Sequence, residues 1–187
     1  MSGVAWRSNV AAAAIVSIAF VPACGADSSH NTAPTESSHT IRDQCDRTLI
    51  FFENDLGIDD LAIEYGSDDP DAEIGRGATC TLTKASVVGV GETRLRATLP
   101  NESEPALVKG DPNYVAQNGY DEKVWVNQSD GSVRIVTTAD GWQGTLNLNS
   151  DQVNNVGEEP KFDLSDHDVR AASEFLIDLT RELTSQN

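Results

Sequence analysis

The sequence predicts an α+β fold in which a meander of four to five antiparallel strands is flanked by an N-terminal and a C-terminal helix, in two layers. Helical patterns of apolar residues, near 41–57 and 165–183, enclose short segments in which apolar and polar residues alternate. Alternation with a period of two is typical of antiparallel strands with one buried face. Two terminal helices would most simply cover that face, which gives a single domain.

The first helical pattern begins at Ile41. Thr40 is a suitable N-cap, and Gly57 is a suitable stop after the last turn. Cys45 belongs to the apolar stripe, so it can reach a strand beneath the helix. The whole stripe is Ile41, Cys45, Leu49, Phe52 and Leu56.

The alternating segments extend from residue 78 to residue 148. Asp130-Gly131 and Asp140-Gly141 separate consecutive segments and predict tight turns between antiparallel strands. The apolar positions are Ala78, Cys80, Leu82, Leu95, Ala97, Leu99, Val124, Val126, Val133, Ile135, Leu146 and Leu148.

The last helix is predicted to begin after Ser165. Ser165 and Asp168 have the spacing of a capping box, with Asp in place of the usual Glu. The apolar stripe that follows is Val169, Ala172, Leu176, Leu179 and Leu183.

Residues 1–23 have the pattern of a signal peptide. Arg7 precedes an uncharged segment, residues 10–23, which is shorter than the roughly 20 apolar residues that a membrane-spanning helix needs. The segment ends in Val-Pro-Ala followed by Cys24, which resembles the lipobox of bacterial lipoproteins. That resemblance implies that Cys24 carries a diacylglycerol with palmitate-type chains and becomes the first mature residue. Pro22 departs from the usual lipobox.

Ordinary secretion, with cleavage after Ala23 or Ala26, is the alternative. In either case residues 24–40 contain no large apolar side chain, so they predict a flexible tether that includes His30 and His39. Residues 41–187 then form the single α+β domain.

Three cysteines are present, and an odd number in a secreted chain needs an explanation. If Cys24 is acylated, Cys45 and Cys80 remain as a pair that can form a disulfide in an oxidising compartment. The alternative is that both stay reduced and buried.

The formal net charge is −17, from 13 Lys and Arg against 30 Asp and Glu. This charge disfavours nucleic acid and anionic lipid headgroups as partners. We therefore expect attachment to the membrane through the lipid anchor, on the extracytoplasmic face of the cell membrane. An envelope protein or a glycan is the expected partner, and the chain is expected to be a monomer without cofactor or metal.

The chain has no G-x-S-x-G or H-E-x-x-H motif and no phosphate-binding glycine loop, so no catalytic residue and no enzyme activity are predicted. His167 is expected to be a partly exposed residue of the first helical turn. The acidic stretch 66–73 is expected to be a solvated loop; the alternative, a Ca²⁺ site, lacks the expected ligand spacing.

An aromatic group formed by Tyr114, Tyr120 and Trp125 is the candidate binding site. Trp125 alternates with Val124 and Val126, so its side chain is expected on the polar face of the sheet. There it could stack on a sugar or on a partner protein. The alternative is that the long loop before this strand folds over Trp125 and buries it.

The order of lipobox, polar tether, helix with one cysteine, strand with a second, sheet and terminal helix resembles small secreted lipoproteins of actinobacteria. In layout it is also similar to the DUF3558 family. The resemblance implies a lipoprotein and transfers no functional residue. The expected function is a membrane-anchored binding module at the cell envelope. The alternatives are an envelope hydrolase without a recognisable motif and a carrier of an apolar ligand.

Overall fold

The computed structural model describes residues 37–84, 87–99, 102, 104–129, 131–150 and 164–184. The predicted signal peptide, Cys24, His30 and tether residues 24–36 lie outside the described residues. The described chain begins with a strand at Ser37, so the last four residues of the range predicted as tether, including His39, form β1.

The described part of the chain contains two helices and nine strands. The helices are α1 (Ile41–Asn54) and α3 (Asp166–Thr184). The strands are β1 (Ser37–Thr40), β2 (Leu61–Tyr65), β3 (Glu73–Gly75), β4 (Gly77–Lys84), β5 (Val87–Ala97), β6 (Val115–Gln117), β7 (Lys123–Ser129), β8 (Ser132–Ala139) and β9 (Trp142–Asn149).

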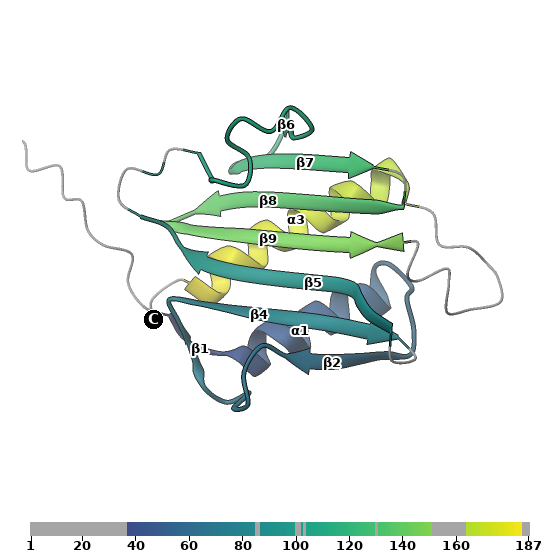
Figure 1. Cartoon of the computed structure of the whole chain (residues 1–187), viewed down its shortest axis with the longest axis vertical. Helices are drawn as coiled ribbons and strands as arrows, with labels where there is room; N and C mark the ends of the chain where they lie inside the picture. The colour runs from purple at the N-terminus through teal and green to yellow at the C-terminus, as the bar shows by residue number, and fades with distance from the viewer. Residues whose placement is uncertain are drawn as a thin grey trace, which may run out of the picture. The chain divides into compact units, whose positions relative to one another are not determined.

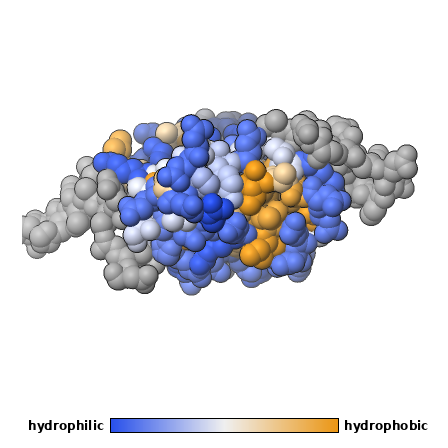
Figure 2. Space-filling model, turned by 90° about the horizontal axis from the view of Figure 1, so that it is seen from below, coloured by the Kyte–Doolittle hydropathy of each residue, from blue (hydrophilic) through white to orange (hydrophobic). Residues whose placement is uncertain are grey.

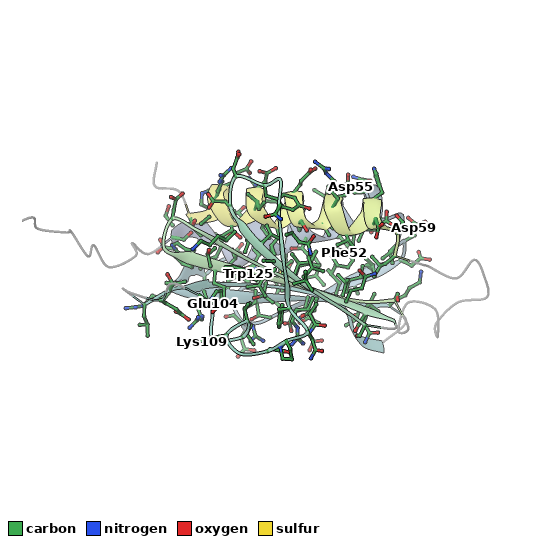
Figure 3. The ribbon with its side chains drawn as sticks, turned by 90° about the horizontal axis from the view of Figure 1, so that it is seen from above. Phe52, Asp55, Asp59, Glu104, Lys109 and Trp125 are labelled. Atoms are coloured by element: carbon green, nitrogen blue, oxygen red, sulfur yellow. A yellow bond between two sulfur atoms is a disulfide. The ribbon has the colours of Figure 1, made fainter. Side chains whose placement is uncertain are left out.

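Seven of the strands form one antiparallel sheet in the order β2-β4-β5-β9-β8-β7-β6, and β1 pairs separately with β3. Helix α1 packs on β4 and β2, whereas α3 packs on β8 and β9. Both helices lie on one face of the sheet, and the long loop before β7 lies on the other (Figures 1 and 3). The predicted α+β class, with two helices against an antiparallel sheet, is confirmed.

The predicted number of strands is wrong: the sheet has seven strands and not four or five, and it is not one continuous meander. The two edge strands, β2 and β6, are short and only half-buried or exposed, so their hydrophobic pattern is weak. Strand β9 pairs with both β8 and β5, because the chain leaves β5, crosses to the far edge and returns. The alternation of apolar and polar residues within each strand gives no information about that crossing.

Local hydrogen bonds determine where both helices begin. The Thr40 hydroxyl accepts from the backbone N–H of Asp43 at 3.1 Å, and the Asp43 carboxylate accepts from the N–H of Thr40 at 2.8 Å. The Asp168 carboxylate likewise accepts from the N–H of Ser165 at 2.9 Å, and the Ser165 hydroxyl accepts from the N–H of Asp168 at 3.3 Å. Both predicted N-terminal boundaries are confirmed by these capping boxes.

Large side chains fill the space between the helices and the sheet. Phe52, Leu146 and Leu176 are completely buried, and Trp142 is 1% exposed. Cys45 of α1 and Cys80 of β4 lie in the same core and form a disulfide, with 5.3 Å between their Cα atoms. The predicted pairing of these two cysteines is confirmed.

Two glycines of the sheet allow the helices to approach closely. A Cβ atom at Gly91 would lie 2.3 Å from the ring of Phe52. A Cβ atom at Gly144 would lie 2.2 Å from the hydroxyl of Thr180. Real Cβ contacts are longer than this, so each helix rests directly on a strand position that has no side chain.

Figure 2 views the molecule from the side of the β2 edge and shows that this face is mostly hydrophilic, with a large hydrophobic patch among the hydrophilic side chains. Half-buried apolar residues on β2 and α1 include Leu61, Ile63 and Leu49. No helix within the described ranges is long and apolar enough to cross a membrane.

Candidate functional site

The sheet face opposite the helices carries polar side chains in register across four strands. Glu92 of β5 lies opposite Asn147 of β9, and Asn147 lies opposite Arg134 of β8. Arg134 in turn lies opposite Asn127 of β7. Residues directly opposite one another in antiparallel strands have their Cβ atoms about 5 Å apart. We call Glu92, Asn147, Arg134 and Asn127 the polar row.

Hydrogen bonds connect three members of the polar row. The side-chain amide of Asn147 donates to the Glu92 carboxylate at 3.1 Å, and the Arg134 guanidinium donates to the amide oxygen of Asn147. Arg94 adds a cation 3.6 Å from the same Glu92 oxygen. These bonds hold the side chains in place. The guanidinium, amide and carboxylate groups keep further donor and acceptor positions for hydrogen bonds to a ligand.

An open cleft of about 390 Å³ lies over the polar row. Its lining includes all four members of the row, the hydroxyls of Ser129 and Ser132, and Gly89. The two serine hydroxyls are hydrogen-bonded to each other at 2.8 Å. This volume is within the range of small-ligand sites, and the lining offers both donors and acceptors.

The remaining part of this face is covered by the loop that precedes β7. Val108 of the loop is 5% exposed and packs on Trp125 and Val136, and Tyr114 packs against the same cluster. Trp125 is therefore only 9% exposed. Of the two alternatives drawn from the sequence, the structure has the one in which the loop covers Trp125. The indole ring is not available for stacking in this conformation.

Glu102 fastens the start of the covering loop to the sheet. Its carboxylate accepts from Arg96 of β5 at 2.9 Å, and Arg96 also donates to the side-chain oxygen of Gln143 at 2.9 Å. Partial burial opposes ionisation of Glu102, but the hydrogen bonds from Arg96 and from the N–H of Leu99 outweigh it. The pKa of Glu102 therefore lies below its ordinary value.

The predicted aromatic site is divided between two places. Tyr114 and Trp125 lie together beneath the loop, whereas Tyr120 packs against the main core. The hydroxyl of Tyr114 is buried, and no described residue is its hydrogen-bond partner. The three aromatic residues thus do not form one exposed surface.

The acidic stretch 66–73 packs against the beginning of α1. The carbonyls of Pro70 and Ala72 accept from the backbone N–H groups of Arg42 and Ile41 at 2.8 and 3.0 Å. The Arg42 side chain donates to the Asp71 carboxylate at 2.7 Å, which lowers the pKa of Asp71. Within the described ranges, no group of three or more His, Cys, Asp or Glu side chains could hold a metal ion.

The histidines of the described residues are peripheral. His39 lies in β1, with its Nδ1 atom 3.9 Å from the Asp43 carboxylate. His167 lies in the first turn of α3, and its side chain is 89% exposed. His167 thus lies in the first helical turn as expected, but its side chain is almost fully exposed and not partly exposed.

Among the described residues, several carboxyl groups with a lowered pKa take part in a cap or an ion pair. Glu102 and Asp71 are two such groups. A third is Asp43, whose pKa is lowered by the hydrogen bond from the N–H of Thr40. Partial burial of Asp168 opposes ionisation, but the hydrogen bonds from Ser165 lower its pKa overall.

The polar row was not predicted as a site. Its members are polar partners in alternating segments, so the sequence indicates that each faces away from the helices. Their proximity depends on β9 lying between β5 and β8, and Glu92 and Asn147 are 55 positions apart. Only the strand order shows that they are neighbours.

The chain matches no family model and no curated protein. Among solved structures it is similar to the crystal structure of a GTP binding regulator from Thermotoga maritima, at 10% sequence identity. That similarity covers 80% of this chain and 95% of the other, with a TM-score of 0.33, a level that carries no argument about fold or function.

Proposed function

We propose that this chain is an extracytoplasmic lipoprotein, anchored to the cell membrane through acylated Cys24, whose domain binds a hydroxyl-rich ligand of the cell envelope such as a glycan. The observation that carries the ligand class is the open cleft over the polar row. Glycan hydroxyls both donate and accept, and the amide, carboxylate and guanidinium groups of the row supply both kinds of partner.

Two features support the location. The lipobox-like segment places Cys24 at the end of the uncharged run. The Cys45–Cys80 disulfide suits an oxidising compartment outside the cytoplasm. Together with the acidic charge, which disfavours direct adsorption to anionic lipid, they favour attachment through acyl chains.

The packing favours a binding module over the alternative of a carrier for an apolar ligand. A carrier needs space between the sheet and the helices, but Phe52 and Thr180 occupy the positions nearest Gly91 and Gly144. The large side chains there are completely buried. The cleft on the opposite face is open to solvent and polar.

The anchor is tested by metabolic labelling of the full chain with an alkyne analogue of palmitate in a bacterial host. We expect label in the membrane fraction, and loss of both label and membrane association for Cys24→Ala. Cys45→Ala is the matched control and should keep the label. Equal labelling of the Cys24→Ala variant would exclude the proposed anchor.

The ligand class is tested by sedimentation of the full chain, carrying Cys24→Ala, with insoluble cell-wall glycan. Arg134→Ala and Asn147→Ala should each reduce the bound fraction, because they remove hydrogen bonds at the floor of the cleft. Lys109→Ala is the control, since Lys109 is exposed on the covering loop (Figure 3). Equal retention of all three variants would contradict binding through the polar row.

A further inference from the structure

A second surface lies on the helix side of the sheet, away from the polar row. A groove of about 230 Å³ runs between α1 and α3. Figure 3 shows Asp55, at the end of α1, on this side of the sheet, with Glu104 and Lys109 of the covering loop on the other. The residues lining the groove are Arg47, Ile50, Phe51, Asp55, Phe175, Asp178, Leu179 and Glu182.

The centre of the groove is apolar and closely packed. Phe51 and Phe175 stack with their ring centroids 4.2 Å apart and their planes 3° from parallel. Phe51 and Leu179 are 4% and 1% exposed, so they belong to the core as well as to the groove. A site whose shape exists before binding loses little conformational entropy when a ligand enters.

Ile50 adds an exposed apolar residue to the groove. It is 54% exposed although it is large and apolar. The four apolar lining residues are adjacent to four charged ones, which is the arrangement of an interaction surface with an apolar centre and a polar rim.

The rim has an excess of negative charge. Arg47 of α1 donates to the Glu182 carboxylate of α3, so this cation is already paired and also connects the two helices. Among the described residues, no Lys, Arg or His forms an ion pair with Asp55 or Asp178. The rim therefore offers two carboxylates to an incoming cation.

From this lining and charge we infer that the groove binds a basic amphipathic segment of a partner protein. One or two apolar side chains of the segment enter between Ile50 and Phe175, and its Lys or Arg side chains face Asp55 and Asp178. The volume is below the range of about 300–1,000 Å³ that is usual for small-molecule sites, and it suits a few side chains of a peptide.

Charge disfavours two other occupants. A second copy of this chain would bring another net charge of −17 to an acidic rim, and like charges placed together oppose association. An anionic lipid surface is repelled for the same reason. A basic segment is attracted over a distance comparable to the screening length, which also increases its association rate.

The test measures fluorescence anisotropy of a labelled amphipathic helix of leucine and lysine, added to the full chain carrying Cys24→Ala. A matched peptide with glutamate in place of lysine is the first control. We expect saturable binding of the lysine peptide alone, weakened at 0.5 M salt because exposed charges are screened within about 4 Å there. Equal binding of both peptides would overturn the proposal.

Variants of the rim and of the apolar lining separate the two contributions. Asp55→Asn combined with Asp178→Asn should weaken binding about threefold to tenfold, the effect of losing two exposed ion pairs. Ile50→Ser should weaken it about fivefold through lost apolar contact. Asp59→Asn combined with Glu104→Gln also removes two exposed carboxylates and should have less than about a twofold effect, since neither residue lines the groove.

An unchanged affinity for the Asp55→Asn, Asp178→Asn variant would refute the inference. Flotation with phosphatidylcholine vesicles identifies the competing occupant: binding that Ile50→Ser abolishes and the rim variant does not would assign the groove to lipid and overturn the proposal. The inference is independent of the glycan cleft. Arg134→Ala should leave peptide binding unchanged, so the two proposals can fail separately.

Discussion

Gly144→Ala tests the close contact between α3 and the sheet. Gly144 has no left-handed backbone conformation, so alanine is compatible with the strand. Its new methyl group would nevertheless lie 2.2 Å from the Thr180 hydroxyl and 3.2 Å from side-chain carbons of Leu176 and Thr137. The hydroxyl cannot move freely, because it is buried and donates to the Leu176 carbonyl at 2.7 Å.

The expected magnitude follows from two opposing effects. Overfilling a packed core costs about 1–3 kcal/mol of unfolding free energy. Replacing glycine by alanine restricts the unfolded chain, which stabilises the fold by about 0.4–1 kcal/mol. The steric effect is larger, so we expect a net loss of about 1–2 kcal/mol.

Thr180→Ala removes the atom that the new methyl group meets. The double variant Gly144→Ala, Thr180→Ala should therefore lose less unfolding free energy than the two single variants lose together. We expect the difference to be about 1 kcal/mol or more. The assay is urea unfolding of the full chain with the disulfide intact. Thr48→Ala is the matched control for Thr180→Ala. Like Thr180, Thr48 is a completely buried helical threonine that donates to the carbonyl four residues before it.

Gly144→Ala combined with Thr48→Ala should show losses that add within about 0.5 kcal/mol, since Thr48 contacts β5 and not Gly144. If the Thr180 pair is equally additive, or if Gly144→Ala does not destabilise the protein, the inferred contact between α3 and β9 is wrong.

Three further predictions concern the disulfide, the second helix cap and the covering loop. Reduction of the Cys45–Cys80 bond should lower the urea midpoint. The expected loss of unfolding free energy is about 3–4 kcal/mol, because the disulfide closes a loop across 35 positions. An unchanged midpoint would contradict this. Asp168→Ala should cost about 1 kcal/mol at pH 7. The pKa of Asp168 in the folded protein lies below its ordinary value of 3.8. The ionised side chain therefore stabilises the fold above pH 3.8, and this stabilisation is lost as the pH falls through the folded pKa. The unfolding free energies of the variant and the parent should become equal there. Val108→Asp should open the loop, shifting tryptophan emission to longer wavelength and increasing acrylamide quenching, because Val108 covers Trp125. Unaltered emission would show that the loop does not shield the indole.

The starts of both helices could be predicted because their determinants are local, whereas α1 ends at Asn54, before the predicted stop at Gly57. In each capping box, two residues three positions apart accept hydrogen bonds from each other's backbone N–H groups. The pairs are Thr40 with Asp43 and Ser165 with Asp168. Cys45 belongs to the apolar stripe of its helix and Cys80 alternates inward on its strand, so their pairing was also accessible. The edge strand β2 was not predicted, since a short half-buried strand has little alternation to detect.

The candidate sites depend on distant residues and could not be predicted in the same way. Alternation indicated that Trp125 faces away from the helices, but its burial depends on Val108, which belongs to a loop without a strong pattern. The groove exists because α1 and α3 lie side by side, although about 110 residues separate them along the chain.

By itself, the sequence determined the α+β class, the starts of both helices, the cysteine pair and the strongly acidic charge. These properties depend on neighbouring residues or on composition. The tertiary structure alone decided the strand order, the cover over Trp125, the polar row and the groove between the helices. Each of these is set by which elements pack together, and that packing minimises exposed apolar area for the whole chain rather than for any segment.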